Sequence, residues 1–229
     1  MCSPKKSFME QPYAYSQKHA QQSAERIANL VCASVPQHGG LVVVSGPMAS
    51  GKTLFIISLA EKLAAQAFSY AIAYPDIDRE DIVSGKVISR QGVEAHAQIY
   101  ASGVDLAELV DGISVLILDE IQFTPAKIQE TVLAELLHFR TKGGWIVACG
   151  MRYSSLRRPF PFTETLLTHA DIQLELVASC AVCGARNAKY GQRLVDGRPV
   201  SANAPLFLSP SRQVTYEPRC EHCHQLGQH

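Results

Sequence analysis

Short apolar blocks alternate with longer blocks of helical spacing through most of this chain. The short blocks predict buried strands, because a parallel strand covered on both faces has few polar positions. The longer blocks repeat apolar residues every three or four positions, as in a helix that faces a core. We expect strands at residues 41–44, 69–74, 114–118 and 145–149, and helices at residues 54–67, 106–110 and 125–140.

A polar tail followed by a helix is predicted before the first strand. Residues 1–16 are polar, and Ser16 or Ser23 is a suitable N-cap for a helix that ends near Ser34. The apolar face of this helix consists of Ala24, Ile27, Ala28 and Val31. The alternation of strands and helices that follows predicts an α/β fold with a doubly wound, mostly parallel sheet.

Two further strands are predicted at the margins of this sheet. Residues 86–90 are expected to form an edge strand that turns at Gln91 and Gly92, and residues 174–177 the last strand. Beyond residue 176 the sequence is rich in glycine and proline and contains two cysteine pairs. We therefore expect an N-terminal tail and helix (1–38), a main domain (39–176) and a small C-terminal domain (177–229).

The charge balance and the apolar runs exclude several classes of protein. Lysine plus arginine and aspartate plus glutamate each number 21, so no global field favours nucleic acid or an anionic membrane. No apolar run approaches the roughly 20 residues of a membrane-spanning helix. The N-terminus lacks the apolar core of a secretory signal. We expect a cytoplasmic protein without a membrane or nucleic-acid partner.

The first strand leads into a phosphate-binding motif. Residues 46–53 fit G-x-x-x-x-G-K-[ST], the pattern of a P-loop. Gly46 and Gly51 allow the backbone to curl around a phosphate chain. Lys52 supplies charge for the β- and γ-phosphates, and Thr53 offers a hydroxyl to Mg²⁺. A glycine-rich turn without a ligand is the alternative. The expected ATP-binding residues here are Gly46, Pro47, Met48, Ala49, Ser50, Gly51, Lys52 and Thr53.

An acidic pair follows the strand at residues 114–118. Asp119 and Glu120 stand at its carboxyl end, where α/β sheets present their ligands. Asp119 is the expected partner of Thr53 in holding Mg²⁺. Glu120 is then free to accept a proton from a substrate hydroxyl or to align a water molecule. The alternative is a solvated acidic pair without a catalytic role.

Two C-x-x-C pairs near the C-terminus predict a metal site. Four thiolates form the closed tetrahedral set that structural zinc prefers. A long segment between the pairs would be closed at its base by the metal. His222 and His224 are possible substitute ligands, and a redox-active dithiol is the alternative for one pair. The expected zinc ligands are Cys180, Cys183, Cys220 and Cys223.

Together these motifs resemble the type II thymidine kinases, a family with a P-loop domain and a zinc-bearing lid. The P-loop fits the family's G-P-M-x-S-G-K-[ST], and residues 119–123 fit its D-E-x-Q-F. The lid fits C-x-x-C-G at residues 180–184, Q-R-L-x-D-G-x-P at residues 192–199 and Y-E-P-x-C-x-x-C at residues 216–223. Shorter matches are Pro75 with Asp78 and Arg79, then residues 89–92, and Pro159 with Phe160.

The resemblance implies a role for each matched residue. Glu120 corresponds to the base that takes the proton of the nucleoside 5′-hydroxyl. Asp119 and Thr53 correspond to the residues that hold magnesium, and Gln122 joins the P-loop and Asp119 in the ATP-binding set. Met48, Phe123 and Tyr216 correspond to residues that contact the pyrimidine nucleoside. The resemblance also implies a homotetramer.

We therefore expect a thymidine kinase of nucleotide salvage, which makes thymidine monophosphate and ADP for DNA synthesis. The sequence differs from the family at Thr124, at residues 150–156 and at residues 210–212, all on the nucleoside side. A kinase for another, possibly modified, pyrimidine deoxynucleoside is one alternative. The other is an ATP-binding zinc module whose lid contacts protein or nucleic acid through Arg186, Lys189, Arg193, Arg198, Arg212 and Arg219.

Overall fold

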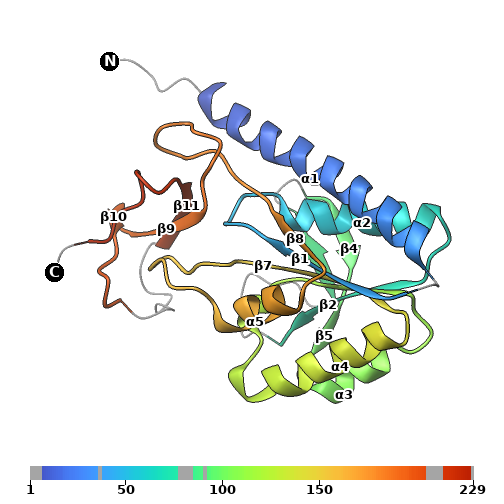
Figure 1. Ribbon diagram of the computed structural model, residues 1–229. Coiled ribbons are helices and arrows are strands. Elements are labelled where there is room, and N and C mark those ends of the chain that lie inside the picture. The colour runs from blue at the N-terminus through green and yellow to red at the C-terminus, as the bar shows by residue number, and fades with distance from the viewer. Residues whose placement is uncertain (1–6, 36–37, 77–84, 90–91, 205–213, 228–229) are drawn as a thin grey trace.

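A computed structural model describes residues 7–35, 38–76, 85–89, 92–204 and 214–227 (Figure 1). The family matches expected at Asp78, Arg79, Arg90 and Gln91, and the difference at residues 210–212, lie outside the described residues. The helices are α1 (Ser7–Ser34), α2 (Lys52–Ala65), α3 (Gly103–Leu109), α4 (Gln129–Thr141) and α5 (Pro161–His169). The strands of the main sheet are β1 (Gly40–Ser45), β2 (Tyr70–Pro75), β5 (Gln98–Tyr100), β6 (Val115–Leu118), β7 (Trp145–Gly150) and β8 (Ile172–Glu175).

These six strands form one parallel sheet in the order β5-β2-β6-β7-β1-β8. Helices α1 and α2 cover one face of the sheet, and α3, α4 and α5 cover the other (Figure 1). Successive residues of β1 point to opposite faces, with Val42 and Val44 in the first core and Leu41 and Val43 in the second. The predicted doubly wound α/β fold is confirmed.

Helix α1 begins earlier than the sequence pattern predicted. The expected polar tail over residues 1–16 is wrong from Ser7 onward, because the helix starts there and contains Pro12. The predicted apolar face is confirmed, since Ala24, Ile27, Ala28 and Val31 are all buried, together with Ala20. This face packs against α2.

The predicted edge strand at residues 86–90 is wrong in its pairing. Strand β3 (Lys86–Ile88) instead forms an antiparallel hairpin with β4 (Glu94–His96), apart from the main sheet. The side chains of Lys86 and Glu94 form a diagonal ion pair across this hairpin, with Nζ and Oε1 2.7 Å apart. The edge of the main sheet is β5, which pairs with β2 and was not predicted. Three residues per strand are too few for a periodic signal.

Three further elements, α4, α5 and β8, also differ from the prediction. The helix expected at 125–140 is divided into a 3₁₀ turn, η2 (Ala126–Ile128), and α4. Helix α5 was not predicted, although Pro161 stands at its first turn and Phe162, Leu166 and Leu167 are buried on one side. Strand β8 begins two residues before the expected 174. Element ends are the least certain part of pattern reading.

A small antiparallel sheet follows the main one. Strands β9 (Tyr190–Val195), β10 (Arg198–Pro199) and β11 (Val214–Arg219) pair in the order β10-β9-β11. We call residues 177–204 and 214–227 the lid, which lies beside the carboxyl ends of the main strands (Figure 1). Within the described residues, no helix combines the length and the apolarity needed to span a membrane.

Candidate active site

The P-loop connects β1 to α2 through residues 46–51. Ala49 and Gly51 adopt left-handed backbone conformations, with φ of 64° and 92°. The backbone N–H of Gly46 donates to the carbonyl of Gly150 at 3.2 Å, which ties the start of the loop to β7. No side chain caps the N-terminus of α2. The first backbone N–H groups of this helix, with its positive dipole end, are therefore suited to bind an anion.

Lys52 lies within the P-loop and is largely buried, with 9% of its surface exposed. Its Nζ donates to the carbonyls of Gly46 and Pro47, each at 2.9 Å. Strands β1 and β6 both pair in parallel with β7, so the P-loop and Asp119 follow the sheet at the same edge. The charge of Lys52 lowers the pKa of Asp119 there. The predicted P-loop lysine and the predicted magnesium-binding carboxylate are thus brought together.

Helix α1 forms a wall behind the P-loop. A Cβ at Gly51 would lie 3.0 Å from Cβ of Ala20 and 3.1 Å from the carbonyl oxygen of Ser16. Gly51 therefore serves both the left-handed turn and the close approach of α1. The hydroxyl of Ser50 is fully buried, and its oxygen has no hydrogen-bond partner among the described residues.

Asp119 is buried at the carboxyl end of β6. Only 5% of its surface is exposed, and Oδ1 accepts the backbone N–H of Glu120 at 2.8 Å. Burial raises the pKa of Asp119 to about 7, the neighbouring charge of Glu120 adds to the rise, and Lys52 opposes it. A divalent cation would favour the ionised carboxylate, because it replaces the missing solvation with positive charge.

Glu120 projects from a strained backbone position beside Asp119. Its φ of 52° and ψ of 33° are left-handed, and it caps the 3₁₀ turn η1 (Ile121–Phe123). The side-chain amide of Gln122 donates to its carboxylate. The carbonyl of the same amide accepts the backbone N–H of Met151 at 2.9 Å. Left-handed non-glycine residues concentrate at functional sites. Gln122 links the Glu120 carboxylate to Met151, the residue that follows β7.

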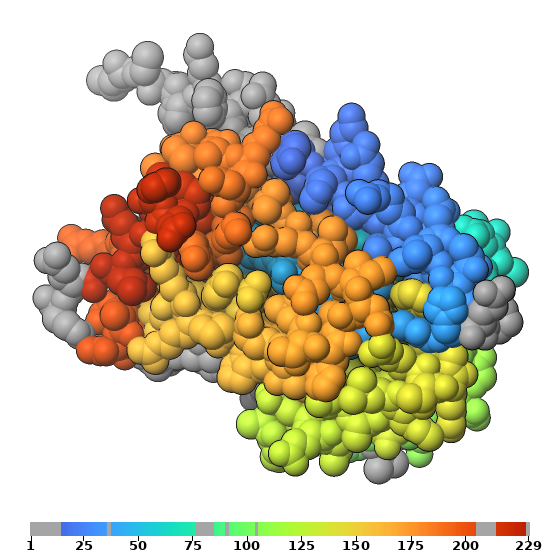
Figure 2. Space-filling view, viewed as in Figure 1, coloured from blue at the N-terminus to red at the C-terminus, as the bar shows by residue number. Residues whose placement is uncertain are grey.

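The nucleoside residues expected from the resemblance lie on three different elements. Met48 lies in the P-loop and Phe123 in η1, both half-buried, while Tyr216 lies on β11 of the lid and is 39% exposed. Phe123 packs edge-on against Phe160, with ring centroids 6.1 Å apart. Tyr216 stands on the separate three-stranded sheet of the lid. Figure 2 shows a hollow between the yellow and orange segments, with blue atoms of an earlier segment at its bottom.

Thr124, where the sequence differs from the family, has a structural partner. Its hydroxyl is buried and lies 2.9 Å from the hydroxyl of Tyr100, the last residue of β5. Burial raises the pKa of Tyr100, and the bond to Thr124 opposes that rise. Thr124 therefore satisfies a buried phenol behind the acidic pair, a role that the local sequence did not indicate.

The four predicted cysteines converge at the base of the lid. Their sulfur atoms all lie within 4.8 Å of one another, and those of Cys183 and Cys220 are 3.7 Å apart. Zinc–sulfur bonds of about 2.3 Å in a tetrahedron place sulfurs roughly 3.8 Å apart. The donor set therefore fits a structural zinc ion. His224 is engaged elsewhere, with Nε2 at 3.0 Å from the carbonyl of Ser155, and His222 is outside the cluster.

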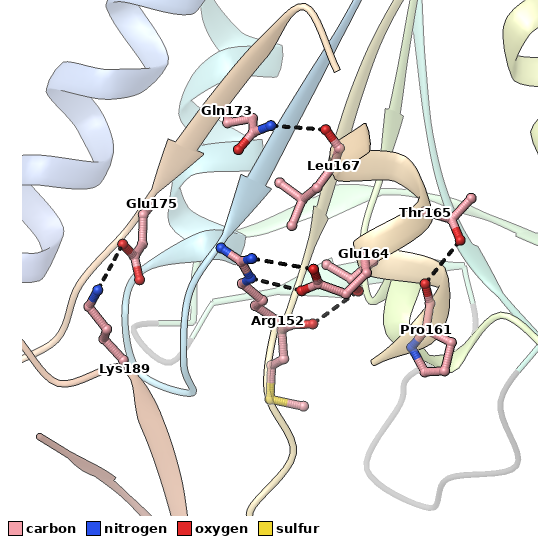
Figure 3. Close-up of polar contacts among 10 residues, drawn as sticks. Arg152, Pro161, Glu164, Thr165, Leu167, Gln173, Glu175 and Lys189 are labelled. Atoms are coloured by element: carbon pink, nitrogen blue, oxygen red, sulfur yellow. Dashed lines mark hydrogen bonds and ion pairs between the residues drawn. The ribbon is translucent and has the colours of Figure 1, made fainter. Parts of the chain in front are cut away.

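The basic residues of the lid contact other parts of the chain. Arg186 lies over the ring of Tyr15 of α1 at 4.6 Å, and Lys189 pairs with Glu175 at 3.5 Å (Figure 3). Arg193 is fully buried, and Arg219 pairs with Glu217 at 2.5 Å. Among the described basic residues of the lid, Arg186, Lys189 and Arg219 thus have partners within the chain, Arg198 is exposed, and Arg212 lies outside the described residues.

Sequence reading missed the segment that follows β7. Arg152 makes a two-pronged contact with Glu164 of α5, with nitrogen–oxygen distances of 2.8 and 3.3 Å (Figure 3). Arg157, farther along, contacts the lid through His224 and Glu221. Both arginines stand in a stretch without a recognisable motif, and their partners are distant in sequence. No local signal could have identified them.

Comparison with known proteins agrees with this geometry. The family model described as thymidine kinase matches residues 39–224. A thymidine kinase of Thermococcus kodakarensis is 33% identical over 197 residues, which cover 82% of this chain and 96% of that protein.

Two solved structures share a weaker likeness. A DNA replication initiation factor matches at 12% identity and a TM-score of 0.40, over 67% of this chain and 46% of its own. The replication initiator DnaA, bound to AMPPCP and single-stranded DNA, matches at 11% and 0.39, over 65% and 44%. The chain thus spans less than half of either structure. From the family match and the curated relative together, the chain belongs to the thymidine kinase family.

Proposed function

We propose that this protein transfers the γ-phosphate of ATP to the 5′-hydroxyl of thymidine, giving thymidine monophosphate and ADP. The observation that carries the proposal is that the P-loop and the pair Asp119 and Glu120 follow two parallel strands, β1 and β6, which both flank β7. Phosphoryl transfer needs positioned phosphates and a group that takes the proton of the attacking hydroxyl. This site offers both within one family-matched region.

The P-loop binds the phosphates in the proposed reaction. The N-terminus of α2, free of a side-chain cap, and the curled backbone of residues 46–51 offer N–H groups to the phosphate chain. Lys52, now held by two carbonyls, offers its charge to the transferred group. Bound magnesium, held by Thr53 and Asp119, would neutralise phosphate charge.

Glu120 is the proposed general base. Its carboxylate is fixed by the Gln122 amide, and that amide is fixed in turn by the N–H of Met151. A carboxylate so oriented can accept the proton of the 5′-hydroxyl as that oxygen attacks phosphorus. We propose that Met48 and Phe123 contact the pyrimidine from the main domain and that Tyr216 contacts it from the lid.

Several parts of the proposal concern the whole molecule. We propose that the four cysteines bind a structural zinc ion, which the spacing of their sulfurs supports. We also propose three parts of the chain, an N-terminal tail and helix (1–38), a main domain (39–176) and a lid domain (177–229). We further propose that the protein is a cytoplasmic homotetramer that acts in nucleotide salvage. Gel filtration with light scattering would test the tetramer.

A nucleoside panel tests the proposed activity. The purified protein is incubated with labelled ATP, Mg²⁺ and thymidine, deoxyuridine, deoxycytidine or deoxyadenosine, and labelled monophosphates are separated. Lys52→Ala is the matched control for contaminating kinases. We expect thymidine monophosphate from the unchanged chain only. Labelling of another nucleoside in preference to thymidine would correct the substrate, and no labelled product would overturn the activity.

A further inference from the structure

The segment after β7 runs from the acidic site to the lid. We call residues 151–160 the linking loop. At its start, the N–H of Met151 donates to Gln122, whose amide holds Glu120. The loop then folds back on itself, since the N–H of Ser154 donates to the carbonyl of Arg158 at 2.8 Å and that of Phe160 to Arg152 at 2.9 Å. A single compact segment therefore contacts both Gln122, which holds the proposed base, and the lid.

Arg157 makes the contact with the lid. Its guanidinium donates to the carbonyl of Glu221 at 2.6 Å and to the carbonyl of His224 at 3.1 Å. Its Nε donates to Nδ1 of His224 at 3.2 Å, and the group lies over the ring of Tyr190 at 4.9 Å. Glu221 lies between the second pair of cysteines, and His224 follows it. The planar fork thus grips the turn that carries two of the proposed zinc ligands.

His224 forms the lid's side of this contact, through both nitrogens of its ring. Because its Nδ1 accepts from Arg157, its Nε2–H is left to donate to the carbonyl of Ser155 at 3.0 Å. Its ring also meets Tyr190 edge-on at 5.5 Å, and Tyr190 packs against Tyr153 at 5.4 Å. Contacts from both sides therefore join the linking loop to the lid around one buried histidine.

The backbone of Arg157 is strained, and the contacts of its side chain offset that strain. Its φ of 59° is left-handed, a conformation that glycine adopts freely and that strains other residues. Such strain persists where the surroundings over-determine it, and it often marks a functional position. Here the compensation is visible in the three hydrogen bonds and the aromatic contact of the guanidinium.

We propose that Arg157 is a positioning residue that fixes the lid, and with it Tyr216, over the nucleoside side of the active site. Strand β11 carries Tyr216 and runs directly into the turn that Arg157 grips. The other end of the linking loop holds Gln122, so one segment sets both the lid and the proposed base. The claim that Arg157 docks the lid rests on these contacts alone. The claim that this docking affects nucleoside binding rests on the proposed function.

Arg157→Gly is the central test, because glycine accepts the left-handed backbone while the grip is lost. Arg158→Ala removes an equal charge from the exposed neighbour and is the matched control. In Arg157→Gly we expect KM for thymidine to rise by about tenfold or more, with KM for ATP and the zinc content unchanged. Added ethylguanidinium should lower KM again in Arg157→Gly and have no effect on Arg158→Ala.

Hydrogen exchange separates failure of this proposal from failure of the proposed activity. In Arg157→Gly, amides of residues 214–227 should exchange faster while those of β1 and β6 do not, whether or not thymidine is the substrate. Unchanged exchange in the lid would overturn the docking role. Faster exchange with an unchanged KM for a nucleoside that the parent chain phosphorylates would overturn the positioning role, and so would loss of zinc with equal rises in both KM values. If Arg157→Gly does not fold, Arg157→Asn, which also tolerates this backbone, replaces it.

Discussion

The backbone N–H of Glu120 donates to the Asp119 carboxylate at 2.8 Å, so two adjacent acids share one strand end and yet differ in environment. Asp119 is buried and faces Lys52, whereas Glu120 is half-exposed and is held by Gln122. Two carboxylates in different environments can take different tasks. The predictions that follow begin with this pair.

Asp119 should make the protein less stable as pH rises. Its pKa is about 7 in the folded chain against an ordinary value of 3.8, so the folded state resists ionisation. The free energy of unfolding therefore falls between about pH 4 and pH 7. Asp119→Asn should raise it at pH 8 by roughly 2–4 kcal/mol, and the two proteins should converge near pH 4. Thermal unfolding in a chelating buffer measures this, and parallel pH profiles would contradict it.

Glu120→Gln should abolish turnover while ATP still binds. The amide has the size of the carboxylate but cannot accept the proton, so kcat should fall by about 10²–10⁴-fold. Titration with labelled ATP should give a dissociation constant close to that of the parent chain. Glu164→Gln, which changes a carboxylate on α5, is the control for a general charge effect. A retained kcat in Glu120→Gln would remove Glu120 as the base.

Thr124→Val should destabilise the protein by leaving the Tyr100 hydroxyl buried without its partner. Loss of one partner from a buried pair costs about 1–3 kcal/mol. Thr124→Ser keeps the hydroxyl and should cost less. The double change Thr124→Val with Tyr100→Phe removes both polar groups, so it should restore part of the loss. Urea unfolding measures all three, and equal stability of the valine and serine variants would refute the pairing.

Cys183→Ser should release the proposed zinc and loosen the lid without unfolding the main sheet. The cysteines pack in a small cluster of their own, separate from the two cores of the sheet. The parent chain should bind about one zinc per molecule, since the site has one set of four ligands. Cys32→Ser, on α1, should keep the metal. Metal analysis and hydrogen exchange of β9–β11 measure the outcome, and full zinc retention in Cys183→Ser would contradict the assignment.

The elements predicted well are those whose signal lies within a short stretch of sequence. The central strands are apolar throughout, because helices cover both faces of the sheet, and the P-loop lies where its motif indicated. The pairing of β3 and the strands β4 and β5 were not predicted, since each of these strands has three residues and two of the three are exposed. Helix α1 was predicted too short because the prolines and polar residues before Ser16 were read as a tail.

For the site, local motifs identified the residues but not their supports. The acidic pair and the cysteines were visible because their chemistry requires fixed spacing. Gln122 holds Glu120 through Met151, and Thr124 meets Tyr100, across different strands. Arg157 reaches His224 from a distant part of the chain. Such contacts depend on how the sheet and the lid are assembled, and a single sequence does not record that.

Helix α1 lies outside the segment matched by the family, and yet it shares the core of the sheet. Ala20, Ala24 and Ala28 pack into that core with no exposed surface, and Ser16 backs the turn at Gly51. A chain shortened to start at residue 39 would expose the apolar side of α2 and remove the wall of the P-loop. The limits of shared ancestry and the limits of cooperative folding therefore differ in this protein, and expression of the catalytic region alone should yield an insoluble product.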